Sequence, residues 1–149
     1  MATIAQIVGE IHARAAGKTA KEYRLLREFP IGAVLRQGDV YVMRVKSVKG
    51  APAPNRQLAP GNSKGSRHIV EGDVQMLTGW DAPKTLFADA AQALRVPRER
   101  LCSVLAGPAI VSEGAFRVTH PEHADCTLPG GSYITWGQLD PRTMRRVQD

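Results

Sequence analysis

The sequence predicts an α+β protein: an antiparallel β-sheet, or a small barrel or sandwich, with two N-terminal helices and one central helix. Apolar residues at helical spacing near the N-terminus indicate the first helices. Short β-type runs separated by glycine and proline turns fill most of the remaining chain. One amphipathic stretch interrupts them in the middle. With 149 residues and 43% hydrophobic content, the chain can bury one core.

The first thirty residues predict two short helices. The first spans about residues 4–15 and is indicated by apolar side chains at positions i, i+3, i+4 and i+7: Ile4, Ile7, Val8 and Ile11. The second begins at Thr19, because Thr19 and Glu22 match a capping box, and it ends at Pro30. We therefore expect a helical segment over residues 1–30 and a single β-rich domain over residues 31–149.

Seven runs in the β-rich part have strand patterns and are bounded by turn residues. They cover residues 40–45, 68–71, 74–77, 109–112, 115–120, 125–128 and 132–136. A central helix is predicted to open at Asp81 as N-cap, with Pro83 in its first turn, and to end at Pro97. The basic tail over residues 142–147 also has a helical pattern.

Residues 44–67 contain six basic side chains and no acidic one, and removing them leaves 14 basic and 14 acidic residues. The net charge of +6 therefore lies in this basic stretch, whose prolines and glycines predict a long loop between two strands. A concentrated positive charge on a neutral body is a candidate contact surface for an anionic partner. The predicted contact residues are Arg44, Lys46, Lys49, Arg56, Lys64 and Arg67.

The leading functional hypothesis is a non-catalytic binding or assembly protein. The basic loop would contact a neighbouring subunit in a homo-oligomer or larger assembly, including a virion, or a polyanion. An alternative is sequence-independent nucleic-acid binding by the loop together with Arg142, Arg145 and Arg146. An aromatic content of 5% provides few side chains for stacking on bases. No complete catalytic motif is present, so the sequence favours a protein without enzymatic activity and without a cofactor.

A second alternative comes from the histidines. His120, Glu122 and His123 lie within four residues, and His68 begins a separate predicted strand. Imidazole and carboxylate groups bind divalent transition metals such as zinc. The four residues could therefore form the metal site of an enzyme that acts on an anionic substrate. Pro121 excludes the helical His-Glu-x-x-His arrangement, and a polar hairpin turn with solvated side chains explains the same residues.

The cysteines and the distribution of apolar residues indicate in which cellular compartment the protein is expected. Cys102 and Cys126 have no CxxC spacing, which favours reduced thiols over a disulfide framework. The N-terminus lacks the pattern of a secretory signal, and no apolar run reaches the length of a membrane span. We expect a cytoplasmic or virion-associated protein without a membrane partner.

Several segments resemble small bacterial and phage-encoded β-rich proteins of unassigned function. The motifs are Val-Thr-His-Pro-Glu-His at residues 118–123, Leu-Pro-Gly-Gly-Ser-Tyr at 128–133 and Arg-Arg-Val-Gln-Asp at 145–149. Residues 37–41 and 66–68 resemble earlier segments, so the resemblance covers about residues 35–149. It implies no established activity. In that pattern a histidine pair sometimes stands where this chain has Arg67 and His68, so a four-histidine metal site is incomplete here.

Overall fold

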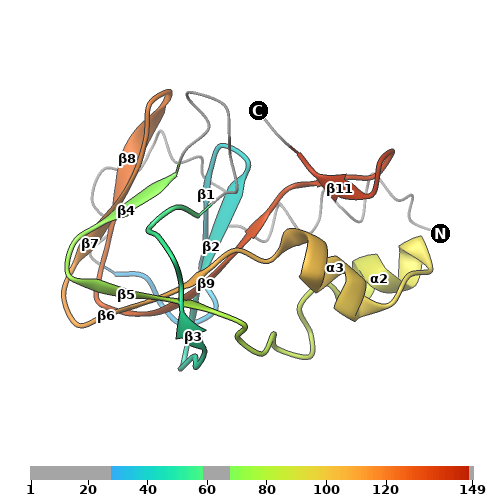
Figure 1. The fold of residues 1–149 in the computed structure, drawn as a ribbon, viewed down its shortest axis with the longest axis horizontal. Helices are drawn as coiled ribbons and strands as arrows, with labels where there is room; N and C mark the ends of the chain where they lie inside the picture. The colour runs from blue at the N-terminus through green and yellow to red at the C-terminus, as the bar shows by residue number, and fades with distance from the viewer. Residues whose placement is uncertain (1–27, 59–67, 148–149) are drawn as a thin grey trace.

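The computed structural model describes residues 28–58 and 68–147 (Figure 1). The predicted N-terminal helices lie almost wholly outside these residues, and residues 28–30 are not helical. In the described part of the chain no helix combines the length and the apolar character needed to cross a bilayer.

Most strands belong to a six-stranded antiparallel sheet. Its order is β1 (Val34–Gln37), β2 (Val40–Val45), β9 (Gly131–Gly137), β6 (Ala109–Ser112), β5 (Val74–Thr78) and β3 (Ala51–Pro52). A three-stranded antiparallel sheet has the order β4 (Ile69–Glu71), β7 (Phe116–His120) and β8 (His123–Leu128). A short hairpin joins β10 (Leu139–Asp140) to β11 (Arg145–Arg146).

The segment that contains β3 connects the two larger sheets at one side. Ala53 donates a backbone hydrogen bond to Met76 of β5, whereas Leu58 donates one to His68 immediately before β4. One chain segment therefore pairs first with the large sheet and then with the small one. Figure 1 shows β4, β7 and β8 standing at an angle to β5 and β6. This corner gives the β-strands the shape of a partly closed barrel.

A single glutamine joins the sheets at the opposite side. The side-chain amide Nε2 of Gln37, at the end of β1, donates to the carbonyl of Val118 on β7 at 3.1 Å and of Ala124 on β8 at 2.9 Å. We call this contact between β1 and the β7–β8 hairpin the seam. At the seam, side-chain hydrogen bonds replace the backbone hydrogen bonds that join paired strands within a sheet.

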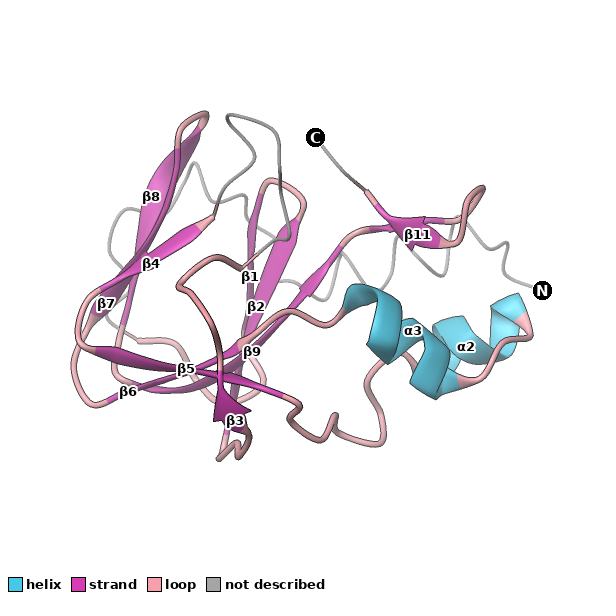
Figure 2. Ribbon diagram, in the orientation of Figure 1, coloured by secondary structure: helices cyan, strands magenta, loops and turns pink. Residues whose placement is uncertain are grey.

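Alternating residues of the large sheet face two separate hydrophobic cores. On β2, Val40 and Val42 point into the core between the sheets, where they meet Phe116, Leu128 and their neighbours. Tyr41 points the other way, into a core shared with Ile134 and Trp136 of β9. The helices α2 (Ala88–Leu94) and α3 (Arg98–Leu105) pack on this second core (Figure 2).

The structure confirms an α+β architecture with antiparallel sheets, and all seven predicted strands are present to within a few residues. The predicted basic loop is partly strand, because residues 44–45 belong to β2 and residues 51–52 form β3. The strands β1, β10 and β11 were not predicted. The predicted tail helix is wrong, since Arg145 and Arg146 pair with Asp140 and Leu139 as β11.

The central helix was also misplaced. Phe87 has a left-handed backbone conformation with φ of 62°, so the regular helix α2 begins at Ala88 rather than near Asp81. Before it, Leu86 donates to the carbonyl of Pro83, as in a tight turn. The helix also ends earlier than predicted, at Leu94, and Pro97 is the N-cap of α3. The described chain therefore has two short helices where one central helix was predicted.

Candidate functional site

Three of the predicted site residues come together at the end of the seam. His68 precedes β4, His120 ends β7, and His123 begins β8 after a two-residue turn. The ring of His120 lies between the other two, with its centroid 4.4 Å from that of His68 and 4.5 Å from that of His123. His68 is completely buried, His120 is 6% exposed and His123 is exposed. We call these three residues the histidine site.

Gln37 determines which atom of His68 carries a proton. Because its Nε2 donates to two carbonyls, its Oε1 is the atom that faces Nδ1 of His68, at 2.8 Å. A carbonyl oxygen can only accept, so Nδ1 of His68 is the donor. The amide orientation and the histidine proton are thus assigned from one hydrogen-bond network.

The other ring nitrogen of His68, Nε2, lies 3.0 Å from Oδ1 of Asp39 in the turn between β1 and β2. Burial alone would raise the pKa of Asp39. The hydrogen bond and charge of His68, with the charge of Arg146, outweigh burial and hold this pKa below its ordinary value of 3.8. An ionised Asp39 can only accept, so both ring nitrogens of His68 face acceptor oxygens, Nδ1 that of Gln37 and Nε2 that of Asp39.

His120 has one ring nitrogen without a partner. Its Nδ1 accepts a hydrogen bond from the backbone N–H of Glu122 at 3.0 Å, so in the neutral ring the proton is on Nε2. Burial, followed by the charges of His68 and His123, lowers the pKa of His120 and keeps the ring neutral. Nε2 is buried and has no hydrogen-bond partner. His120 therefore holds an unsatisfied N–H donor.

The turn between β1 and β2 touches this site through Gly38. Its φ is +58°, and a Cβ built at Gly38 would lie 2.6 Å from Nε2 of His123 and 3.4 Å from Cε1 of His68. Glycine meets both requirements, because it adopts positive φ without strain and leaves room for the rings. The histidine site thus depends on the Gln37-Gly38-Asp39 turn, which the sequence indicated only as a turn.

The three predicted histidine ligands are adjacent, but both nitrogens of His68 and one nitrogen of His120 are already hydrogen-bonded. His68 uses both nitrogens, Nδ1 of His120 accepts from a backbone amide, and Glu122 is exposed in the turn. Among residues 28–58 and 68–147, no group of three or more histidine, cysteine, aspartate or glutamate side chains is arranged to hold a metal ion. The site presents donors rather than lone pairs.

The predicted basic contact residues have different environments. Arg44 on β2 is half-buried and donates to the carbonyls of Phe29 at 2.8 Å and Gly130 at 3.1 Å. Arg56 donates to the carbonyl of Gly72. Lys46 and Lys49 are exposed between β2 and β3, whereas Lys64 and Arg67 lie outside the described residues. Two of the six residues thus hold neighbouring backbone segments together.

Sequence reasoning missed Gln37 and Asp39, and it named Arg146 only as a possible nucleic-acid contact of the basic tail. Gln37 and Asp39 flank the glycine of a turn and signal nothing beyond turn chemistry. Arg146 was expected as an exposed basic tail residue, but Nε and Nη2 of its guanidinium are buried. Its charge acts on Asp39, which places the C-terminal hairpin near the same turn. No pattern in the sequence connects positions so far apart.

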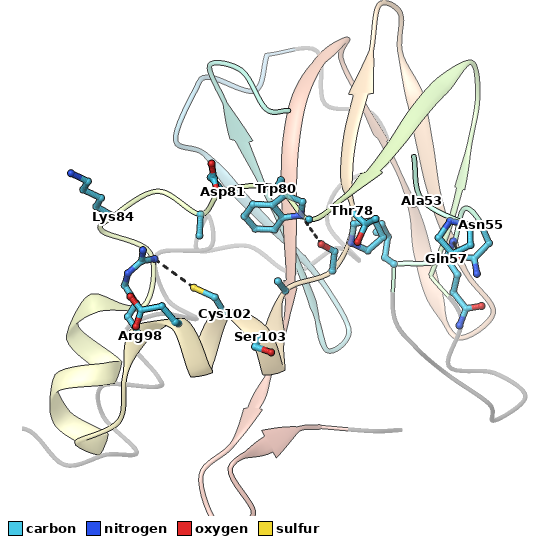
Figure 3. A pocket seen from close by; sticks show the side chains of 18 residues that line it. Ala53, Asn55, Gln57, Thr78, Trp80, Asp81, Lys84, Arg98, Cys102 and Ser103 are labelled. Atoms are coloured by element: carbon cyan, nitrogen blue, oxygen red, sulfur yellow. Dashed lines mark hydrogen bonds between the residues drawn. The ribbon is translucent and has the colours of Figure 1, made fainter. Parts of the chain in front are cut away.

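A groove of about 1340 Å³ lies elsewhere, between α3, the segment after β5 and residues 53–58 (Figure 3). Trp80 is fixed there by its indole N–H, which donates to the carbonyl of Gly107 at 2.9 Å. Its charged lining residues balance: Asp81, Lys84, Arg98 and Glu99. No predicted site residue lines the groove, and no buried side-chain atom in it lacks a partner among the described residues.

The family model that matches this sequence is described as a domain of unknown function (DUF8820) and covers residues 36–138. That range contains Gln37, Asp39 and all three residues of the histidine site. No curated protein and no solved structure matches the chain.

Proposed function

Because the chain belongs to the DUF8820 family, whose description carries no activity, we propose a function from its own geometry: a non-catalytic binding domain that takes an anionic oxygen at the histidine site. The buried, unpartnered Nε2–H of His120 is the observation that carries the proposal. An unsatisfied buried donor costs about 1–3 kcal/mol, and an acceptor oxygen from a ligand would recover that free energy.

The donors of the site favour an anionic acceptor oxygen. Both ring nitrogens of His68 face acceptors, so Nε2–H of His120 is left as the unpaired donor. Glu122, the nearest further carboxylate in sequence, is exposed. A hydrogen bond from Nε2 to a charged oxygen is roughly twice as strong as one to a neutral oxygen. The proposed ligand is anionic, as the charge of the chain predicted, but its predicted contact is now the histidine site rather than the basic stretch.

Binding is favoured over catalysis because the reactive groups are committed. Both ring nitrogens of His68 are engaged, by Gln37 and Asp39, so neither faces a substrate. Asp39 accepts from His68, and the thiol of Cys126 is buried against Gln37. A ligand reaches His120 past His123, the exposed ring beside it. His68, Asp39 and Cys126 are therefore engaged within the fold, and Nε2 of His120 supplies a donor to a bound group.

A divalent metal is the second candidate, supported by the close approach of the three rings. To bind through Nε2, His120 must move its proton to Nδ1 and lose the hydrogen bond from Glu122. His68 must release Asp39 or Gln37. Each loss costs roughly 0.5–1.5 kcal/mol or more, so the metal has to overcome an existing network.

The experiment is a titration of the purified protein with inorganic phosphate, followed by the histidine side-chain ¹⁵N resonances and by the melting temperature. We expect saturable shifts at Nε2 of His120 with the proton retained there, and a melting temperature that rises with phosphate. The variant His120→Phe should lose both effects, whereas Lys46→Gln, at an exposed site, should keep them. Absence of a shift at His120 in the folded wild type refutes the proposal.

The same sample separates the metal alternative. Elemental analysis that finds stoichiometric metal, or zinc titration that removes the proton from Nε2 and shifts the Glu122 amide, would replace the anion by a metal as the ligand. Unchanged histidine resonances on adding zinc, with a response to phosphate, would exclude the metal candidate.

A further inference from the structure

Arg146, on β11, is half-buried, and two nitrogen atoms of its guanidinium are buried donors without a hydrogen-bond partner. Its guanidinium lies against Gly137, where even a Cβ would collide with it. Nε and Nη2 are buried and have no hydrogen-bond partner. None of the ion pairs among the described residues includes Arg146. A buried charge without a bonded partner is costly, so this guanidinium calls for an explanation beyond packing.

The two unpartnered atoms are neighbours on one edge of the guanidinium. The N–H bonds of Nε and Nη2 on that edge run side by side and match the two oxygens of a carboxylate. Burial lowers the pKa of Arg146, and the charge of Asp39 opposes this effect. Oδ1 of Asp39 bonds His68, and neither Nε nor Nη2 of Arg146 has a hydrogen-bond partner, so Asp39 does not occupy the edge.

We propose that Arg146 forms a second binding site, distinct from the histidine site, that holds the carboxylate of a small organic acid by two parallel hydrogen bonds from Nε and Nη2. The unpartnered edge and its contact with Gly137 define the site. The inference goes beyond the proposed function, because it concerns a different residue, a different element and a planar ligand group.

Access to this edge depends on the C-terminal hairpin. Only two residue pairs join β10 to β11, Leu139 with Arg146 and Asp140 with Arg145. A ribbon of that length opens more easily than the larger sheets, although Leu139 and Met144 anchor it to the second core. A ligand that bonds Arg146 would hold β11 against Gly137, and the hairpin would then exchange its amide protons more slowly.

The test is a titration of the wild-type chain with acetate, monitored at the Nε–H resonance of Arg146, with acetamide as the matched neutral probe. We expect acetate to shift this resonance in a saturable way and to slow amide exchange at Leu139 and Arg146. Acetamide should do neither. The variant Arg146→Lys, which keeps the charge but loses the planar edge, should weaken acetate binding at least about tenfold.

Arg145→Lys, on the same strand but exposed, is the matched control and should bind acetate like the wild type. If Arg146→Lys does not fold, the wild-type titration still decides. A resonance of Arg146 that does not respond to acetate, or responds equally to acetamide, overturns the inference. His120 is observed in the same spectra, so failure at Arg146 and failure at the histidine site are distinguishable.

Discussion

Gly38 and Asp39 are adjacent in one turn, and their requirements differ. Gly38 supplies a backbone conformation and the space occupied by the edge of His123. Asp39 supplies the carboxylate that accepts from the buried His68. A substitution at either position therefore changes the packing or the hydrogen bonding of the histidines, although neither residue belongs to the histidine site.

We predict that Gly38→Ala destabilises the protein more than Gly79→Ala. Both glycines have positive φ, +58° and +68°, but nothing lies within 4 Å of a Cβ at Gly79. Gly79→Ala should therefore cost only the backbone term, about 1–2 kcal/mol. Gly38→Ala must in addition displace His123. Urea unfolding of both variants measures the difference, and equal free energies of unfolding would show that His123 moves without cost.

The carboxylate of Asp39 should make stability depend on pH in the acid range. Its folded pKa lies below the ordinary value of 3.8, so its contribution is complete above 3.8 and is lost as pH falls through the folded value. The stability advantage of the wild type over Asp39→Asn should therefore be constant above that value and shrink below it. Free energies of unfolding measured across this range test the sign. Asp73→Asn, in an exposed turn, is the control; an advantage over Asp39→Asn that grows on acidification would contradict the assignment.

Strand β2 illustrates how one element combines packing and polar contacts. Val40 and Val42 enter one core, and Tyr41 enters the other. Near its end, the guanidinium of Arg44 ties the strand to the carbonyls of Phe29 and Gly130, and it lies against Gly131. From charge composition alone, Arg44 was predicted to contact a polyanion. In the structure its side chain instead hydrogen-bonds two backbone segments.

We predict that Arg44→Gln destabilises the domain by about 1.5–3 kcal/mol, because hydrogen bonds from a charged group are lost at a half-buried position. Lys46→Gln removes the same charge at an exposed site two residues later and should change stability by less than about 0.5 kcal/mol. Thermal unfolding of both variants provides the comparison. Similar small effects would mean that Arg44 acts only as a surface charge.

At the scale of the whole molecule, the seam decides whether the two sheets form one closed body. Gln37 bonds β7 and β8 through Nε2 and His68 through Oε1, so one side chain links β1 to the three-stranded sheet. The opposite side is joined by backbone pairing through residues 53–58. The seam and the histidine site therefore share their residues, and weakening one should loosen the other.

Gln37→Ala should open the seam. It leaves the carbonyls of Val118 and Ala124 and Nδ1 of His68 without their present partner, at about 1–3 kcal/mol for each group that remains buried. We expect faster amide exchange in β7 and β8 and little change in β6. Gln75→Ala, at an exposed position of β5, is the matched control. Uniformly faster exchange in every strand would indicate global destabilisation instead.

Local patterns were enough for most of the strands, because alternation along a strand and turn residues at its ends are properties of neighbouring positions. They also predicted the hairpin that presents His120 and His123. They failed at β3, β10 and β11, each two residues long, where pairing with a distant segment rather than local preference forms the strand. They misplaced the start of α2 because the left-handed backbone of Phe87 is stabilised by its packing against Trp136 in the second core.

The sequence by itself determined the α+β class, the strand pattern and the excess of positive charge in residues 44–67. Only the tertiary structure decided that His68 meets His120, that Gln37 and Asp39 set its protons, and that the edge of Arg146 is buried. The physical reason is that the contacts of His68 join residues 29 or more positions apart. They depend on strand register and on how the sheets close, and neither is encoded in the spacing of the residues concerned.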